Sequence, residues 1–374
     1  MLKGVYLTLM IGPGVPVPVL RPVIEALESV QVTTSAGQRS GFQLTFTISS
    51  KSALNTILLL LGQVGPFVRA IIIATINGIP NVLMDGVITN QQISPDVQAG
   101  KSTVTLMGED LTAVMDYTEI KGDSYPAMPA ETRVLLILAK YAAFGIAPRI
   151  IPSVFMDTPN LLELTPGHQG TDLRYINMLA DKVGHVFYIE PGPAPGTSLA
   201  YWGPDIKVGL PQPALNINMD AHTNVESLNF SYDGLSKTVP VVFIQLKEAK
   251  KTISVPIPDI TPLNPPLGAI PPFPTKFEFL DGTAKLAPVR ALALGLAKAA
   301  KSADAVTGYG SLDVLRYGRI LKARQLVGVR GAGNAFDGLY YVKSVTHNIQ
   351  RGEYKQSFTL SRNGLVSTTP RVPA

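Results

Sequence analysis

The chain of 374 residues contains no cysteine, which excludes disulfide frameworks and cysteine-ligated metal sites. It also contains few charged residues, because Asp, Glu, Lys and Arg make up only 16% of the sequence while 46% is hydrophobic. That balance is apolar for a free-standing monomer and predicts that partners cover part of the surface. The net charge of +5 is mild. Without a basic stripe that carries interleaved aromatics, we expect no nucleic-acid partner.

The N-terminal residues MLKGVYLTLM lack the layout of a signal peptide, so we expect synthesis in the cytoplasm without one. Residues 57 to 76 are apolar and long enough to span a bilayer. Gly62, Gly65, Pro66 and Arg69 interrupt them, however. We therefore predict a loop followed by a buried strand, and no direct membrane insertion.

The chain also lacks the motifs of common catalytic and metal sites. Its four histidines (His168, His185, His222 and His347) form no HExxH motif. There is no GxSxG nucleophile elbow, and Gly331-Ala-Gly333 lacks the third glycine of a dinucleotide-binding fingerprint. We therefore predict no catalytic residues, no metal ligands and no cofactor. His347 is expected to be a half-exposed sheet residue.

Hydrophobic periodicity divides the chain into three ranges. Residues 1–117 and 225–374 read as β domains, because short segments alternate between apolar and polar residues. Residues 118–224 read as an α+β insertion with two helices and a strand. Within the second β domain, residues 252–275 hold eight prolines and predict an extended connector rather than a packed element. Residues 286–302 predict a helix rich in Ala, Leu and Lys.

The two β domains carry similar hairpins some 250 residues apart, DGVITNQQISPDVQAGKSTVTL (85–106) and DGLYYVKSVTHNIQRGEYKQSFTL (337–360). Both open with Asp-Gly and reach a second glycine fourteen residues later. Both hairpins close on Thr-Leu, but in the second hairpin this pair lies two residues farther from the second glycine. An even offset keeps every strand side chain on its original face of the sheet. Phe358 and Leu360 should therefore occupy the core positions of Val104 and Leu106. The alternative is a chance resemblance between two ordinary Asp-Gly hairpins.

A duplicated β domain has a consequence for assembly. Two similar domains in one chain can make quasi-equivalent contacts, so three copies would present six similar positions around a threefold axis. The residues expected to form the repeated turns are Asp85, Gly86, Gly100, Asp337, Gly338 and Gly352. We expect the substitutions Asp85→Ala and Asp337→Ala together to weaken ring assembly more than either alone.

Several long segments carry a resemblance to a known family. They are VLMDGVITNQQISP, STVTLMGEDLTAVMD, TDLRYINMLADKVGHVFYIEPGPAPGTSLAYWGP, TNVESLNFSYDG and DGLYYVKSVTHNIQRGEYKQSFTLSRNG. The chain resembles the baseplate hub proteins of contractile injection systems. That family includes contractile phage tail hubs, phage late control D proteins and the N-terminal portion of type VI secretion VgrG. The likeness covers nearly the whole chain.

The resemblance implies a mainly β fold with an α+β insertion, in which two tube-like β-barrel domains are related by internal duplication. It implies a homotrimer that joins a hexameric inner tube to a trimeric spike and contacts baseplate wedge components, with cargo possible in its lumen. Many relatives continue into an OB-fold and a β-helical spike, whereas this chain ends soon after Asn363. We therefore expect the spike to be a separate polypeptide. A type VI VgrG-like tip is one alternative.

Some phage hubs carry a lysozyme, so a cell-wall-degrading tail protein is the other alternative. Glu163 and Asp172 have the spacing of that lysozyme's carboxylate pair. The threonine expected six residues after Asp172 is absent, because Met178 stands there. Asp172 is better interpreted as a charge at a helix N-terminus. We therefore predict that the chain is not an enzyme.

Two further features are candidate contact residues. Trp202, the only tryptophan, is expected in a loop, either packing the insertion onto a barrel or anchoring an interface. A basic cluster in the second β domain is either a solvated surface or a contact with a neighbouring protein. We single out Arg316 and Arg319 from this cluster, which comprises Lys285, Arg290, Lys298, Lys301, Arg316, Arg319, Lys322, Arg324 and Arg330.

Overall fold

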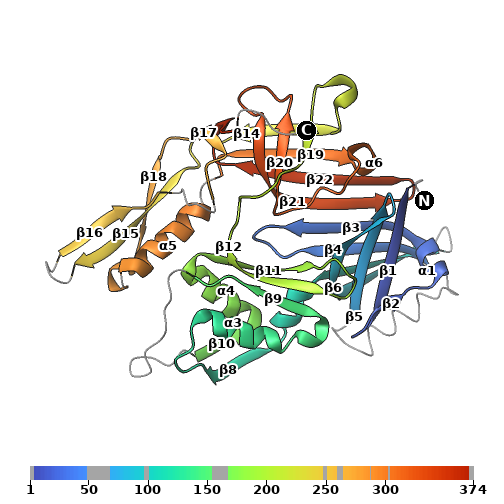
Figure 1. Cartoon of the computed structure of the whole chain (residues 1–374). Helices are drawn as coiled ribbons and strands as arrows, with labels where there is room; N and C mark the ends of the chain where they lie inside the picture. Colours follow the sequence, from blue (N-terminus) through green and yellow to red (C-terminus); the bar gives the residue numbers. More distant parts are fainter. Residues whose placement is uncertain are drawn as a thin grey trace.

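A large, mainly antiparallel sheet of 13 strands forms the body of the protein (Figure 1). The computed structural model describes residues 4–48, 68–96, 101–153, 167–246, 251–258, 264–286, 288–301 and 304–369. Its longest strand path runs β14-β19-β22-β21-β3-β4-β7-β6-β5-β1-β2. Beside this path, β20 pairs with β21, and β13 pairs with β20. Residues from both ends of the sequence contribute to the core packed on this sheet, including Leu44, Val104, Tyr340 and Phe358. The fold is therefore mainly β, as predicted.

The N-terminal part supplies seven strands of this sheet and one short helix. They are β1 (Val5–Pro13), β2 (Val17–Pro18), α1 (Arg21–Ala26), β3 (Leu27–Ser35), β4 (Gly41–Ile48), β5 (Val68–Ile76), β6 (Ile79–Asp96) and β7 (Lys101–Asp110). Strand β5 is almost wholly buried, which confirms the predicted strand that ends at Ile76. The apolar run at residues 57–61 lies outside the described residues. Among those described, no helix is both long and apolar enough to cross a membrane.

The insertion packs helices against two small sheets. Its elements are η1 (Leu111–Asp116), β8 (Glu119–Ser124), α3 (Ala130–Ala139), η2 (Ala142–Phe144), β9 (Ile146–Ile150), β10 (Gly167–Thr171), α4 (Asp172–Val183), β11 (His185–Pro191) and β12 (Ser198–Pro204). Helix α4 begins and ends as predicted, because the hydroxyl of Thr171 accepts a hydrogen bond from the amide of Arg174 and Gly184 adopts a left-handed conformation. Strand β13 (Gln212–Asn216) and η3 (Asp220–His222) then lead back to the main sheet.

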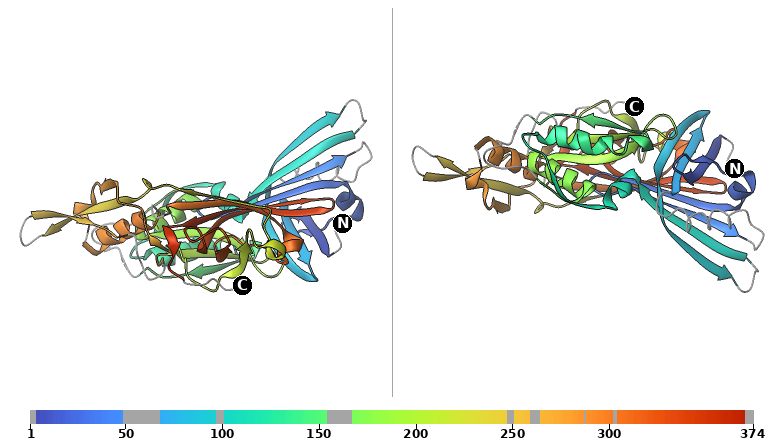
Figure 2. Two further views of the ribbon diagram at one scale, coloured as in Figure 1. Left: turned by 90° about the horizontal axis from the view of Figure 1, so that it is seen from above. Right: turned by 90° about the horizontal axis from the view of Figure 1, so that it is seen from below.

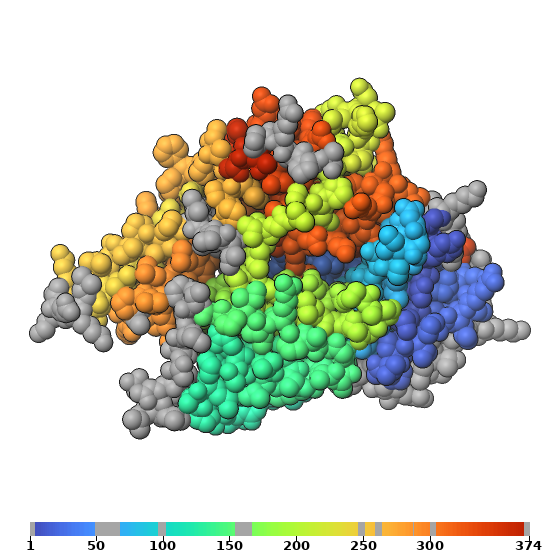
Figure 3. Space-filling model, viewed as in Figure 1, coloured from blue at the N-terminus to red at the C-terminus, as the bar shows by residue number. Residues whose placement is uncertain are grey.

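The second half of the main sheet is interrupted by a lobe that we call the arm, residues 233–305. The sheet elements are β14 (Ser227–Tyr232), β19 (Val306–Asp313), α6 (Val314–Tyr317), β20 (Leu326–Arg330), β21 (Gly338–Gln350) and β22 (Glu353–Arg362), with β23 (Leu365–Ser367) close by. The arm contains β15 (Thr238–Leu246), β16 (Lys251–Pro256), β17 (Gly268–Ile270), β18 (Lys276–Leu280), η4 (Thr283–Lys285) and α5 (Pro288–Lys301). Figures 2 and 3 show its helix and long strands projecting from the body.

The proline-rich stretch at 252–275 is more ordered than predicted. Residues 251–256 form β16, which pairs with β15, and β17 pairs with β23. Ile257 is buried against the helix α5 in the core of the arm. The prediction of an unpacked connector was therefore wrong for these residues. Prolines suppress strand pairing only where the missing amide would have donated, so a strand can end at Pro256.

The two predicted β domains share one sheet instead of standing apart. Strand β21 of the second half pairs with β3 of the first, from Ser344 with Ser35 to Gln350 with Ser29. The pairings follow an open path, so the described residues of one chain form no closed barrel. The division at residues 117 and 224 stays a prediction. Since β21 and β3 share a sheet, the first and third ranges are joined through their backbones.

Candidate assembly surface

Two blocks of four strands lie next to each other in the main sheet. The first has the order β3-β4-β7-β6 and the second has the order β14-β19-β22-β21. The two hairpins that the sequence singled out, β6–β7 and β21–β22, occupy the same place in each block. Their registers also agree, because Ile93 pairs with Val104 and Val345 pairs with Phe358. Val345 lies 252 positions after Ile93 and Phe358 lies 254 positions after Val104, which is the two-residue offset in the sequence.

The faces of these hairpins are as predicted. Val104, Leu106, Phe358 and Leu360 are all buried, with at most 3% of their surface exposed. Their neighbours Thr103, Thr105, Ser357 and Thr359 point to the opposite face and are more exposed. Each hairpin also contains a one-residue register shift, between Ile88 and Asn90 in one and between Val342 and Ser344 in the other. In β6 and in β21, the extra residue reverses which side chains point to the core and which to the opposite face.

Apart from the exposed ring of Tyr309 in β19, the exposed face of the two blocks is polar and uncharged across its middle. Hydroxyl and amide side chains contact each other between strands: Gln31 donates to Asn348 at 3.3 Å, and the hydroxyls of Thr33 and Thr346 are 3.0 Å apart. Such side chains bind water without offering an apolar or charged patch to which a passing protein would adhere. We call this the polar face, formed by Gln31, Thr33, Gln43, Thr45, Thr47, Thr103, Thr105, Ser227, Asn229, Ser231, Thr346, Asn348, Ser357 and Thr359.

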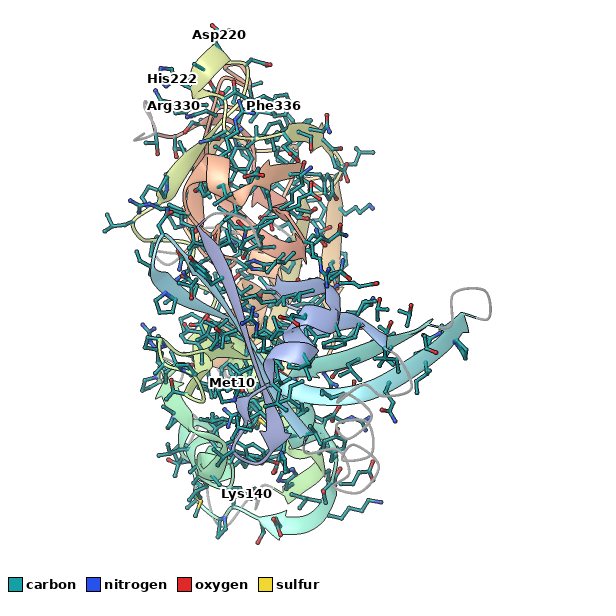
Figure 4. All side chains as sticks on the ribbon, turned by 90° about the vertical axis from the view of Figure 1, so that its right-hand side faces the viewer. Met10, Lys140, Asp220, His222, Arg330 and Phe336 are labelled. Carbon is teal, nitrogen blue, oxygen red and sulfur yellow. The ribbon has the colours of Figure 1, made fainter. Side chains whose placement is uncertain are left out.

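The two blocks differ at one edge. In the second block, the outer edge of β21 is occupied, because β3 pairs with it. In the first block, β5 pairs with β6 only as far as Val87, so residues 88–96 pair with β7 alone among the described residues. Figure 4 shows these outer parts of β6 and β7 extending away from the rest of the chain. At the far end of the strand path, β14 pairs with β19 alone in the part of the chain that the structure describes. An unpaired edge offers amide and carbonyl groups to another strand.

Asp85 is not a turn residue, which corrects the prediction. It lies inside β6 and is 2% exposed. Its carboxylate accepts hydrogen bonds from Nε of Arg69 at 2.6 Å and from Nη2 of Arg69 at 2.7 Å, and a third from the hydroxyl of Ser198 at 3.3 Å. Arg69 also donates to the carbonyl oxygen of Gly196 at 3.2 Å. This buried ion pair therefore joins the sheet to the β11–β12 hairpin of the insertion.

Gly86 is likewise a strand residue, and its φ is not positive. A Cβ atom there would lie 2.1 Å from the carbonyl oxygen of Glu109, so glycine is required by the close approach of β7. Gly338 and Gly352 do have positive φ, at 128° and 86°. The carboxylate of Asp337 accepts a hydrogen bond from the amide of Ala332 at 2.7 Å, so Asp337 closes the loop before β21, whereas Gly338 is the first residue of that strand. Gly100 lies outside the described residues.

Trp202 lies in β12 rather than in a loop, and it is fully buried. It belongs to the core of the insertion, together with Val87 of β6 and Leu111 of η1. Packing between insertion and sheet is therefore its role, and the alternative of an interface anchor was wrong. Arg316 and Arg319 are exposed. Neither forms an ion pair with another residue in the described part of the chain, so their role in an interface stays a prediction.

The candidate carboxylate pair is not assembled in the described part of the chain. Glu163 lies outside it. Asp172 begins α4, and its carboxylate binds Lys140 at 3.3 Å and the hydroxyl of Tyr141 at 2.8 Å, which confirms the helix-terminal interpretation. His347 is 5% exposed, so the expectation of a half-exposed residue was wrong. Among the described residues, no three His, Asp or Glu side chains are grouped as metal ligands would be.

The role of Arg69 as the partner of Asp85 was not predicted from the sequence. A signal was present, because Arg69 precedes the apolar run of a buried strand, and a buried charge requires a partner of opposite sign. Arg324 was expected only as one member of the basic cluster. Nothing in the linear sequence distinguishes that residue from its neighbours, because its surroundings come from Ser35 and Tyr188.

No protein-family model matches this sequence, and no curated protein matches it either. Solved structures do match. A tail protein from Neisseria meningitidis MC58 is 14% identical with a TM-score of 0.62, and the match covers 97% of this chain and 98% of that one. The 43 kDa tail protein of prophage MuSo2 from Shewanella oneidensis is 13% identical with a TM-score of 0.61, and the match covers 96% and 98%.

A component of the E. coli type VI secretion system, described as structurally similar to T4 bacteriophage tail proteins, is 11% identical with a TM-score of 0.56. That match covers 93% of this chain and 76% of the other. The three similar structures are thus two tail proteins and one component of a type VI secretion system. The chain therefore has the fold of phage tail and baseplate hub-like proteins.

Proposed function

We propose that this protein is a non-enzymatic baseplate hub, a homotrimer that joins a hexameric inner tube to a trimeric spike in a contractile injection particle. The similar tail structures support the class of protein, and the two four-strand blocks support the symmetry. Six such blocks from three copies form the ring, which continues the sixfold tube on one side and holds the threefold spike on the other.

The observation that carries this proposal is the pair of unequal edges. The edge of β21 is filled by β3 within the chain, whereas the equivalent edge of β6 is open. The strand equivalent to β3 in the second block is β14, and it is open as well. When the open edge of β6 in one copy meets β14 of the next copy, each block has the same two neighbours. The ring of blocks then closes, and neither of these two edges is left unpaired to cause aggregation.

The polar face lines the lumen of this ring. Its uncharged hydroxyl and amide groups let cargo rest or pass without adhering. Baseplate wedge components contact the outside, where the insertion and the arm lie. When the surrounding sheath contracts, the ring transmits force between tube and spike, so each interface has to be large and tightly packed.

The first test is the mass of the purified chain by multi-angle light scattering, with and without a candidate spike protein. We expect about 120 kDa, three times the 40.0 kDa of one chain, either alone or once the spike is added. A chain that stays monomeric in the presence of spike contradicts the proposal.

The second test locates the contact. Because the natural chain has no cysteine, the pair Ser94→Cys and Ser231→Cys places one thiol on the open part of β6 and one on β14. A short bismaleimide should link copies into covalent trimers. The control pair is Ser94→Cys with Thr197→Cys, which puts the second thiol in the insertion and should give no trimer. Equal crosslinking by both pairs counts against the edge contact.

The likeness to a type VI component supports a second candidate, a VgrG-like tip. A hub requires a separate spike, so purification of particles with a distinct spike polypeptide bound to this chain favours the hub. A cell-wall-degrading role has no comparable support, and incubation of the purified chain with peptidoglycan should release no fragments.

A further inference from the structure

Two large apolar side chains remain exposed at the two open edges of the four-strand blocks. Ile93 lies in the part of β6 that no described strand covers on its outer side, and it is 51% exposed. Tyr232 is the last residue of β14, and it is 39% exposed. Covering such side chains stabilises an assembly, because their apolar surface leaves water. The matching positions of the other block show which neighbours would cover them.

Ile93 matches Val345 of β21 in the registers given above. Val345 is fully buried, although the two residues lie on corresponding strands of corresponding hairpins. The two sites differ at the outer edge. Beside Val345 runs β3, which places Thr34 opposite it and Val32 two residues farther along on the same face. A neighbouring strand on the outer edge is therefore what Ile93 lacks.

Tyr232 matches Val32 when the positions are counted across each block. Through β4 and β7, the pairings lead from Val32 to Gly108. Through β19 and β22, they lead from Tyr232 to Arg362. Arg362 lies 254 positions after Gly108, which is the offset of the other matched residues in β7 and β22. Val32 is fully buried, since β21 runs along its outer side, whereas no described strand runs along the outer side of Tyr232.

We infer that in the proposed ring Ile93 of one copy packs against Tyr232 of the next, in the register that puts Pro95 opposite Tyr232. The register follows from the chain itself, because Pro95 matches His347 and His347 pairs with Val32. Each of the two exposed side chains then gains the kind of neighbour that its match already has inside the chain. This contact rests on the proposed ring, and it defines the side chains and the register of the seam between copies.

The arm leaves the sheet next to this contact. It connects β14 to β19 at the place where a short turn connects β3 to β4 in the first block (Figure 1). The chain turns away directly after Tyr232, because the Asp233 carboxylate accepts a hydrogen bond from the amide of Leu235 at 2.9 Å. The ring of Tyr232 lies near Gly234, where an added Cβ would be 3.5 Å from it. Glycine adds no side chain over the ring, which leaves room for Ile93 of the next copy.

The first experiment measures the contact by dilution of the full-length chain in light scattering, with the spike present if the chain alone is monomeric. Ile93→Ser and Tyr232→Ser should each raise the concentration at which half of the trimer dissociates by at least about tenfold. The matched control is Ile79→Ser, which makes the same change at a 64% exposed isoleucine of β6 that lies outside the seam, and it should leave that concentration unchanged. The urea midpoint of the dilute monomer should be the same for all three variants, because each changes an exposed residue.

The second experiment tests the register. Residues directly opposite in antiparallel strands have Cα atoms about 4.5–5.5 Å apart, which a disulfide can span. The natural chain has no cysteine, so the pair Pro95→Cys with Tyr232→Cys should give covalent trimers on mild oxidation. The control pair is Ile93→Cys with Tyr232→Cys, which is two residues out of register. It should give few covalent trimers, because its Cβ atoms are about 7–8 Å apart.

Failure of the contact and failure of the ring give different results. If the wild type is trimeric but the Ile93 pair forms disulfides as well as the Pro95 pair, the register is wrong and the inference is overturned while the trimer stands. The same holds if Ile93→Ser dissociates at the wild-type concentration, or if Ile79→Ser weakens the trimer equally. A wild type that stays monomeric with spike present overturns the proposed ring, and this contact falls with it.

Discussion

The buried pair of Arg69 and Asp85 gives the sharpest test of how the insertion is held on the sheet. The side chains of both residues are at most 4% exposed, and two short hydrogen bonds join them. Removing one partner leaves the other charge buried without compensation, which costs about 3–5 kcal/mol. We therefore expect Asp85→Ala and Arg69→Met each to lower the free energy of unfolding by about that amount. The double variant Arg69→Met with Asp85→Leu removes both charges, and it should cost less than either single change.

Trp202 provides the assay. It is the only tryptophan, it is fully buried, and it lies in the core that joins the insertion to β6. Urea unfolding followed by its fluorescence therefore reports on this contact directly. The double-mutant cycle should give a coupling energy above about 2 kcal/mol. The control is Glu25→Ala, which breaks an exposed pair with Arg21 at 2.9 Å and should cost less than about 0.5 kcal/mol.

One result would refute this reasoning. If Asp85→Ala unfolds at the same urea concentration as the wild type, the pair does not hold the insertion. If the double variant loses as much stability as the two single variants combined, the two residues act separately.

Two further predictions concern single residues. His347 is buried beside Tyr354 and Gln356, and burial lowers its pKa from 6.5 to about 4. As the pH falls, the unfolded chain therefore binds a proton before the folded chain does. About 3 kcal/mol of stability should be lost between pH 6.5 and 4. Urea unfolding of His347→Gln at pH 7 and pH 4 should show a smaller loss than the wild type, and an equal loss would contradict the assignment. Gly86→Ala should lower the free energy of unfolding by about 2–3 kcal/mol, because the new methyl group meets the backbone of Glu109. In the control variant Gly167→Ala, in β10, the methyl group has room, and stability should change by less than about 0.5 kcal/mol. Similar losses for the two glycine variants would show that the close approach of β7 is not the cause.

Local sequence signals predicted the elements that depend on local physics. Thr171 and Gly184 marked the ends of α4 because a hydroxyl caps amides and glycine adopts a left-handed φ. The prediction for Asp85 and Gly86 failed for a physical reason. An Asp-Gly pair favours a turn only where the chain is free to reverse, whereas here Arg69 holds Asp85 and the backbone of Glu109 lies against Gly86. Both contacts come from distant positions in the sequence.

By itself, the sequence determined the two matching hairpins and the faces of their strands, because side chains alternate with period two and an even offset preserves that alternation. It also determined the ends of α4 and the resemblance to tail proteins. The tertiary structure was needed to show that both halves share one sheet, and that among the described residues one of two corresponding edges is filled while the other is open. These features depend on contacts between residues more than a hundred positions apart, and no local pattern encodes which distant strands and side chains meet.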